Sequence, residues 1–203
     1  LDEVDDQART IGAVNTVVNR QGRLWGTNTD WQGALAALQT EVSLAGQRVL
    51  VLGAGGAGRA IVYGVRQAGG EVSVADADEG RARALAREFG ATCIPLAEAA
   101  REPAAILVNA TPVGMAPQAE AIPLPPDNLE QYKVVMDIVY KPLETRLLRE
   151  AGVRGARTID GLQMLVHQGV RQFELFTGQP APVAIMRQAA LDAIAVSKKL
   201  SRL

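Results

Sequence analysis

Short runs of branched apolar residues alternate with amphipathic segments through the middle of the chain. The first run, residues 49–52, breaks into glycines and resumes as a helical pattern that ends at Ala68. A second apolar run, residues 71–75, ends in Asp76. A strand, a tight turn, a helix and a second strand in this order predict a βαβ unit, in which a crossover helix joins two parallel strands.

The same alternation continues to residue 160. We expect helices or helical turns over residues 79–89, 96–101 and 143–151, and strands over residues 92–95, 106–110, 134–140 and 155–160. The loop 116–132 is rich in proline and acidic residues and is therefore expected to be exposed and mobile. Six strands alternating with helices predict an α/β fold with a Rossmann-like, doubly wound, mainly parallel six-stranded sheet over about residues 46–160.

The N-terminal end follows a different pattern. Apolar runs over residues 11–18 and 24–28 flank a turn and predict a hairpin or a pair of edge strands, and residues 31–42 predict a helix with Asp30 as its N-cap. Polar side chains interrupt the apolar runs at Asn15, Thr16, Asn28, Thr29 and Asp30. Side chains of this kind are suitable partners for a polyhydroxylated ligand, although they would also serve simply to cap the strands.

The C-terminal end consists of two apolar helices, over residues 161–177 and from residue 182 to about 196. Two helices after the last strand are more than one sheet needs. We expect them to pack against the N-terminal strands and form a second lobe, with a ligand cleft between the two lobes.

The glycines after the first apolar run have the spacing of a dinucleotide-binding loop. The loop comprises Gly53, Ala54, Gly55, Gly56, Ala57 and Gly58. In the G-x-G-x-x-G pattern the first glycine permits the turn, the second lets the backbone approach a pyrophosphate, and the third lets the helix pack on the strand. A plain turn would also use glycine, but the βαβ context favours a cofactor site at the helix N-terminus.

Asp76 lies 18 positions after Gly58, at the end of the second strand. This is where a Rossmann unit needs an acceptor for the adenosine ribose hydroxyls, and the alternative is that Asp76 caps the following helix. A carboxylate here would repel the 2′-phosphate of NADP. The sequence therefore predicts NAD as the preferred cofactor, with NADP as the alternative.

Composition narrows the class of protein. The 203 residues carry 21 basic and 22 acidic side chains, so no strong overall field would recruit nucleic acid or an anionic membrane. Because the chain has one cysteine and one histidine, Cys93 and His167, we expect no intramolecular disulfide and no metal site. No apolar run approaches the roughly 18 residues that span a bilayer, and the acidic start is unlike a signal peptide. We expect a cytoplasmic protein.

Six stretches in this order resemble the shikimate dehydrogenase family. They are residues 11–16, 26–30, 53–58, 109–115, 137–140 and 160–168. The resemblance implies an enzyme of aromatic amino-acid biosynthesis that reduces 3-dehydroshikimate to shikimate with a nicotinamide cofactor. Its substrate would be a polyhydroxylated cyclohexene carboxylate, and its oligomeric state stays open between monomer and homodimer.

The resemblance also implies roles for individual residues. Asp30 resembles the aspartate of the family's catalytic Lys/Asp pair, and Asn15, Asp30, Tyr140 and Gln168 resemble its substrate-binding side chains. Asn109, Thr111 and Met115 resemble the loop near the ribose and nicotinamide, and Ile138 and Gly161, from the neighbouring motifs, are assigned to the cofactor as well. The implied domains are a remnant of the substrate-binding domain over 1–32, the nucleotide-binding domain over 33–160, and helices returning to the substrate domain over 161–203.

Two departures from the family pattern affect these expectations. The family's catalytic lysine and a serine pair lie before the segment that opens this chain, and the first lysine here is Lys133. We therefore expect the 203 residues alone to have little activity, whether they are a truncated chain, a proteolytic fragment or part of a fused dehydroquinate dehydratase–shikimate dehydrogenase. At the adenosine end, Ala77 stands where many relatives have an arginine.

Two further functions remain as alternatives. A quinate/shikimate dehydrogenase is the nearest variant, and a dinucleotide-binding module without catalysis belongs to a different class. Asn15, Asp30 and Gln168 favour an enzyme, because a module that only binds a cofactor needs no side chains for a polyol. The missing lysine favours the module for the chain as it stands.

Overall fold

A computed structural model describes residues 1–200 of the chain, and the side chains of residues 1–195. Its larger sheet is built from six strands: β4 (Arg48–Leu52), β5 (Glu71–Ala75), β6 (Thr92–Cys93), β7 (Ile106–Asn109), β8 (Val134–Asp137) and β9 (Arg157–Ile159). All pairs are parallel, in the order β6-β5-β4-β7-β8-β9. The chain starts in the middle, runs to one edge and then crosses to the other, which is the doubly wound Rossmann order and confirms the predicted fold.

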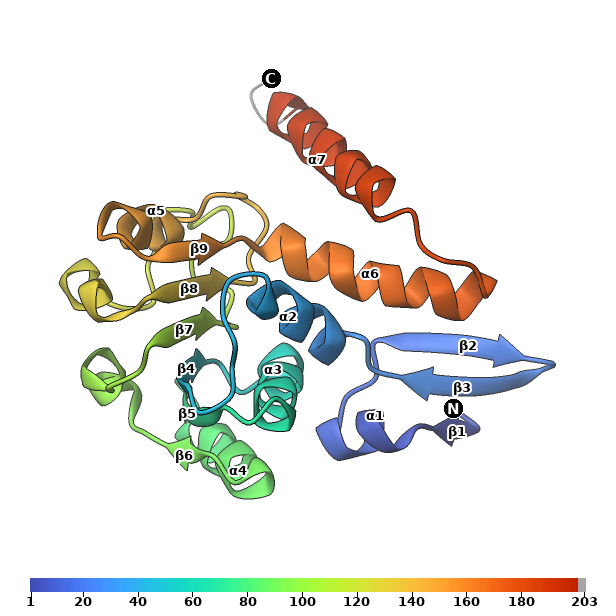
Figure 1. The fold of residues 1–203 in the computed structure, drawn as a ribbon, viewed down its shortest axis with the longest axis horizontal. Coiled ribbons are helices and arrows are strands. Elements are labelled where there is room, and N and C mark those ends of the chain that lie inside the picture. The colour runs from blue at the N-terminus through green and yellow to red at the C-terminus, as the bar shows by residue number, and fades with distance from the viewer. Residues whose placement is uncertain (201–203) are drawn as a thin grey trace.

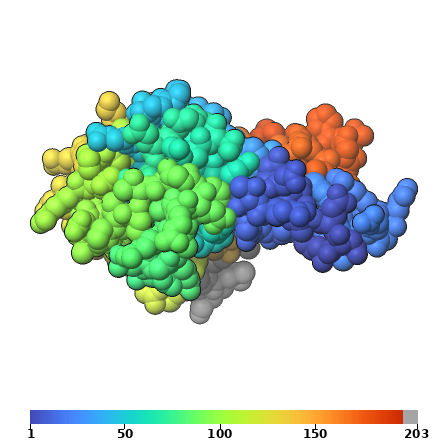
Figure 2. Space-filling view, turned by 90° about the horizontal axis from the view of Figure 1, so that it is seen from below, coloured from blue at the N-terminus to red at the C-terminus, as the bar shows by residue number. Residues whose placement is uncertain are grey.

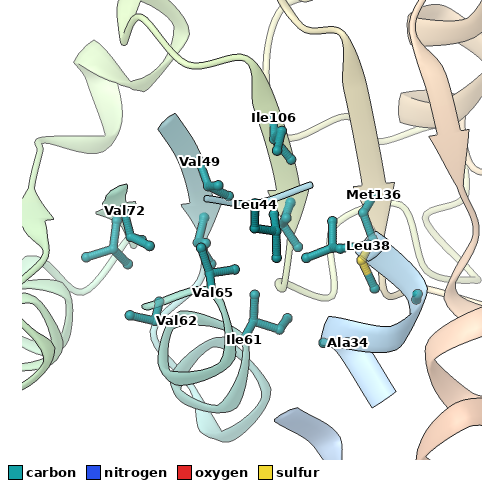
Figure 3. Close-up of a cluster of buried hydrophobic side chains, with 14 of the residues drawn as sticks. Ala34, Leu38, Leu44, Val49, Ile61, Val62, Val65, Val72, Ile106 and Met136 are labelled. Atoms are coloured by element: carbon teal, nitrogen blue, oxygen red, sulfur yellow. The ribbon is translucent and has the colours of Figure 1, made fainter. Parts of the chain in front are cut away.

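Helices cover both faces of this sheet. On one face lie α2 (Asp30–Gln39), α3 (Gly56–Gln67) and α4 (Glu79–Phe89), and on the other lie α5 (Arg146–Val153) and the short 3₁₀ helices η1 (Leu96–Arg101) and η2 (Pro126–Gln131). Figure 3 shows side chains of α2 and α3, among them Leu38 and Ile61, directed at the strands. In β4, Val49 and Val51 enter this core, whereas Leu50 and Leu52 enter the other. Because successive side chains of a strand point to opposite faces, a strand buried on both sides is apolar throughout.

The loop over residues 116–132 differs from the expectation. Its second half contains η2, and the side chains of Leu124 and Leu129 are 3% and 0% exposed. Both pack in the second core together with Tyr132. The prediction of an exposed loop is therefore wrong for this half, because apolar residues among the prolines anchor it to the sheet.

The N-terminal residues form a small three-stranded sheet. It comprises β1 (Glu3–Val4), β2 (Thr16–Arg20) and β3 (Arg23–Thr27), with α1 (Asp6–Ile11) between β1 and β2. Strands β2 and β3 pair as the expected antiparallel hairpin, and β1 pairs parallel to β3. The strand expected from residue 11 begins only at Thr16, because Ile11 ends α1 and Gly12 terminates that helix with a φ of 73°.

The helix α2 leads from the small sheet into the Rossmann lobe. Asp30 is its first helical residue rather than its N-cap, and Thr29 occupies the cap position. The side-chain oxygen of Asn28 accepts hydrogen bonds from the N–H groups of Asp30 and Trp31, at 2.9 and 3.4 Å. The prediction was thus wrong by one residue, since a neighbouring asparagine supplies the cap, and the helix ends at Gln39 instead of residue 42.

Of the two C-terminal helices, α6 connects the two lobes. Helix α6 (Gly161–Thr177) starts beside β8 and β9, crosses α2 and reaches β2, while α7 (Val183–Leu200) packs on α6 (Figure 1). Figure 2 shows the larger mass around the six-stranded sheet, which we call the Rossmann lobe, and a narrower one formed by the N-terminal residues and α6. The N-terminal residues up to Thr29, with the three-stranded sheet, are called the small lobe. Among residues 1–200, no helix has both the length and the apolar character needed to cross a bilayer.

Candidate active site

The glycine loop after β4 has the shape that its spacing predicts. Gly53 has a φ of 106°, and a Cβ added at Gly58 would lie 2.1 Å from the Gly53 carbonyl oxygen. Both positions therefore require glycine. A Cβ at Gly55 would meet nothing within 4 Å, so open space lies at the N-terminus of α3. The N–H groups of the first helical turn have no partner within the helix and favour an anion there, which suits the pyrophosphate of a dinucleotide.

Asp76 follows β5 and contacts this loop. Its Oδ2 accepts a hydrogen bond from the N–H of Ala54 at 2.6 Å, and its Oδ1 accepts one from the N–H of Asp78 at 2.8 Å. The N-cap of α4 is Asp78, whose side chain accepts from the N–H of Arg81. The alternative in which Asp76 caps that helix is therefore wrong, and its carboxylate instead ties the end of β5 to the glycine loop.

Two adjoining cavities lie at the carboxyl ends of the strands of the six-stranded sheet. In Figure 1 the arrowheads of β7, β8 and β9 mark these ends and point toward the small lobe. The first, of about 400 Å³, is lined by residues 110–112, 115–116 and 138–141 and includes the predicted cofactor residues Thr111, Met115 and Ile138. The second, of about 360 Å³, is lined by Asn15, Asp30, Ala57, Ile138, Tyr140, Gly161, Met164, Leu165, Gln168 and Gln172. Ile138 and Tyr140 line both, so the two cavities meet at these side chains.

The second cavity contains all four side chains predicted to bind substrate. Asn15 comes from the loop before β2, Asp30 from the start of α2, Tyr140 from the segment after β8, and Gln168 from α6. These residues are up to 153 positions apart in sequence, from 15 to 168. The packing of α6 on α2 and on β2 brings Asn15, Asp30 and Gln168 together. The cavity also touches Ala57 of the glycine loop and Gly161, so polar groups for a ligand face the nucleotide-binding region.

Asp30 is held by a side-chain amide. The Nδ2 of Asn15 donates to Oδ1 of Asp30 at 2.6 Å and to Oγ1 of Thr29 at 3.1 Å. Burial raises the pKa of the Asp30 carboxyl from its ordinary value, and the hydrogen bond from Asn15 lowers it in part. A partly desolvated carboxylate that faces a cavity can accept a hydrogen bond from a ligand hydroxyl or exchange a proton with a neighbouring group.

Gln168 is oriented by its own helix and by Thr29. Its Nε2 donates to the Leu165 carbonyl oxygen at 3.0 Å, and its Oε1 accepts from Oγ1 of Thr29 at 3.3 Å. Gln172 lies one helical turn further along α6 in the same cavity and was missed by the sequence analysis. Its spacing of four residues from Gln168 is the signal that could have identified it, because such residues share one face of a helix.

Asn109 does not offer a surface to a cofactor. It is fully buried, its Oδ1 accepts from the N–H and the Oγ1 of Thr111 at 3.1 and 2.6 Å, and its Nδ2 donates to the Val113 carbonyl and to Asp137. The expectation that Asn109 itself contacts the cofactor is therefore corrected: Asn109 shapes the loop that carries Thr111 and Met115.

Comparison with known proteins gives matches over the segments that line these two cavities. Residues 161–191 match the family model described as the shikimate 5′-dehydrogenase C-terminal domain, and residues 48–141 match the one described as NADP oxidoreductase, coenzyme F420-dependent. The shikimate dehydrogenase (NADP(+)) of Thermococcus kodakarensis is 48% identical, over 96% of this chain and 71% of its own length. The chain belongs to the shikimate dehydrogenase family.

Solved structures extend this similarity to three dimensions. Shikimate 5-dehydrogenase from Thermus thermophilus, in complex with NADP(H) and shikimate, has a TM-score of 0.87 and 47% identity over 95% of this chain and 73% of its own. Quinate dehydrogenase from Corynebacterium glutamicum, in complex with NAD, has a TM-score of 0.87 and 36% identity over 95% and 72%. The fold of this chain, including its N-terminal strands and C-terminal helices, is thus similar to that of these two structures.

One further residue, Asp137 at the end of β8, lies in a stretch that resembles the family but was given no role from the sequence. Its Oδ1 accepts from Nδ2 of Asn109 and from the N–H of Val139, both at 3.0 Å, and its Oδ2 accepts from Oγ1 of Thr145 at 2.7 Å. One carboxyl group therefore links the two segments that wall the first cavity to the N-cap of α5. A lone acidic residue that ends an apolar strand was the available signal.

Asp137 should make the stability of the protein depend on pH. Burial raises its pKa from 3.8 to about 6 despite three hydrogen bonds. The folded state then holds the proton more tightly than the unfolded state, so the stabilisation is complete below about pH 4 and is lost as the pH rises to about 6. The shift of about two units corresponds to at most about 3 kcal/mol.

Asp137→Asn should remove this slope from the free energy of unfolding, measured in urea between pH 4 and pH 7. The matched control is Asp127→Asn, since the side chain of Asp127 is 100% exposed. Parallel curves for the wild type and Asp137→Asn over that window would contradict the assignment.

Proposed function

We propose that the protein catalyses the reversible reduction of 3-dehydroshikimate to shikimate with a nicotinamide nucleotide. The observation that carries this proposal is the second cavity, in which Asn15, Asp30, Tyr140 and Gln168 converge beside the glycine loop. Four polar side chains from separate elements match a small ligand with several hydroxyl groups. A module that only binds a dinucleotide would have no use for them.

The residues of the cavity suit the charge changes of this reaction. The bound dinucleotide would supply the hydride that reduces the ketone carbon. Asp30 is proposed to hold a substrate hydroxyl and to share the proton that the new alkoxide requires, as the aspartate of the family's Lys/Asp pair. Asn15 fixes the carboxylate of Asp30 through its 2.6 Å hydrogen bond, and Gln168 and Tyr140 are proposed to orient the rest of the ring.

Asp30→Asn should separate catalysis from cofactor binding. In the enzyme with any preceding segment retained, we expect kcat for 3-dehydroshikimate to fall about 10²–10⁴-fold, the range for a positioned proton-transfer group. Affinity for the nucleotide, followed by fluorescence titration, should stay close to wild type because Asp30 lies outside the βαβ unit. Asp127→Asn serves as the exposed control, and a collapse of nucleotide binding in Asp30→Asn would instead make Asp30 a structural residue.

We further propose that the nucleotide is preferentially NAD. Asp76 places a carboxylate at the glycine loop, and Ala77 provides no cation beside it. The nearby Arg81 and Arg83 are paired within α4 and its cap, to Asp78 at 3.1 Å and to Glu79 at 2.5 Å. Two unit charges about 4 Å apart repel by up to about 4 kcal/mol at a protein surface, and even a third of that energy changes affinity about tenfold. Similar proteins include both a shikimate dehydrogenase named for NADP(+) and a quinate dehydrogenase solved with NAD, so the proposal rests on Asp76 and Ala77 of this chain.

Asp76→Asn should shift cofactor choice toward NADP. The wild type is expected to bind NAD about tenfold or more tightly than NADP, and the variant to gain NADP affinity while losing hydrogen bonds to the NAD ribose. Titration of both nucleotides against both proteins measures this. Glu130→Gln, at an exposed position of η2, is the charge-matched control. Tighter binding of NADP by the wild type, or no gain for NADP in Asp76→Asn, would show that Asp76 does not select the cofactor.

A further inference from the structure

Gln172 lines the second cavity, but its side-chain amide is committed to the small lobe. Its Nε2 donates to Oγ1 of Thr16 at 3.0 Å. The side chain of Thr16, at the start of β2, is only 2% exposed. This bond spans 156 positions of sequence and joins α6 to the small sheet.

The proton of the Thr16 hydroxyl is directed by this contact. A hydroxyl has one hydrogen to donate, and Oγ1 of Thr16 already accepts from Gln172. Its hydrogen is therefore free for another acceptor, and Oδ1 of Asn15, at 2.8 Å, is closer than Oγ1 of Thr29, at 3.4 Å. The three side chains form a chain of hydrogen bonds that points from α6 toward Asn15, which we call the Gln172 relay.

The relay and the backbone N–H of Thr29 together fix which end of the Asn15 amide faces Asp30. Oδ1 of Asn15 accepts from the hydroxyl of Thr16 and also from the backbone N–H of Thr29 at 2.9 Å, and a backbone N–H can only donate. The NH₂ group must then face the other way, where it lies 2.6 Å from the Asp30 carboxylate. A reversed amide would place an oxygen against that carboxylate and an NH₂ group against a backbone donor.

We propose that Gln172 is a positioning residue that acts through Thr16 to hold the Asn15 amide on the Asp30 carboxylate. The proposal rests on the proposed function, because it assigns Gln172 to the same catalytic site. Gln172 is distinct from Gln168, which is bonded to Leu165 and Thr29 instead. Loss of the relay leaves Asn15 with one fewer restraint and so weakens its bond to Asp30.

The relay can be read out at Asp30 itself. Burial raises the pKa of this carboxyl, and the bond from Asn15 lowers it. Among the described residues that line the cavity, Asp30 is the one charged group and Tyr140 the other titratable one. A looser Asn15 should therefore raise the pKa of Asp30 further, without a competing change in charge.

The test uses two variants that break the relay at different points. Gln172→Met keeps the length of the side chain without its donor, and Thr16→Val keeps the volume without the hydroxyl, whereas Thr16→Ser retains the hydroxyl as the matched control. The pKa of Asp30 is measured by carboxyl ¹³C NMR on the full protein, with Asp30→Asn to assign the signal. We expect an upward shift of up to about one unit in both single variants, none in Thr16→Ser, and no larger shift in the double variant.

Steady-state kinetics provide the second readout. The acidic limb of the kcat/KM profile for 3-dehydroshikimate should move with the pKa of Asp30, kcat/KM should fall about two- to tenfold, and the KM for the nucleotide should not change. An unmoved Asp30 pKa in either single variant, or additive shifts in the double variant, would overturn the relay. So would a rise in substrate KM alone for Gln172→Met, which indicates direct contact with substrate. Absence of dehydrogenase activity in the wild-type enzyme with any preceding segment retained would contradict the proposed function, while the NMR titration would still decide the relay.

Discussion

The close approach of α2 and α6 is the constraint on which the site depends. A Cβ added at Gly33 of α2 would lie 2.7 Å from the Cβ of Gln168 and 2.8 Å from the carbonyl oxygen of Met164. Only glycine lets the two helix backbones meet at this distance. Asp30 lies three residues before Gly33 on α2, so this contact sets the separation between Asp30 and Gln168 across the cavity. It also brings Gln172 within hydrogen-bonding distance of Thr16.

The parallel sheet supplies the other half of the site. Its strands end together, and each end contributes one feature: the glycine loop after β4, Asp76 after β5, the Asn109 loop after β7 and Asp137 at the end of β8. Hydrogen bonds among Asn109, Thr111 and Asp137 hold the walls of the first cavity, so two fully buried side chains, those of Asn109 and Asp137, shape it without lining it. In the low dielectric of this region such bonds are strong and orient their neighbours firmly.

The sequence was most informative where the structure is set by local pattern. The apolar run 49–52 and the glycines after it predicted both the strand and the turn. A strand that is buried on two faces needs apolar residues throughout, and the positive φ at position 53 needs glycine, so both features can be recognised from residue types alone. The convergence of Asn15, Asp30 and Gln168 was suggested only by family motifs. The relay from Gln172 and the burial of Asn109 were not predicted, since both depend on neighbours that are distant in sequence. The same limit explains the misplaced N-cap at Asp30, where Asn28 provides the capping oxygen.

The most direct test of this account is the substitution Gly33→Ala, compared with Gly152→Ala. A Cβ at Gly152 of α5 would make only an ordinary contact, 3.8 Å from Cγ2 of Thr158. We predict that Gly33→Ala lowers the free energy of unfolding by about 1–3 kcal/mol and lowers kcat/KM for 3-dehydroshikimate, because the helices must move apart. Affinity for the nucleotide should be largely retained. Gly152→Ala should leave activity unchanged and add up to about 1 kcal/mol of stability. Wild-type stability and full kcat/KM in Gly33→Ala would contradict the claim that the contact between α2 and α6 positions the site.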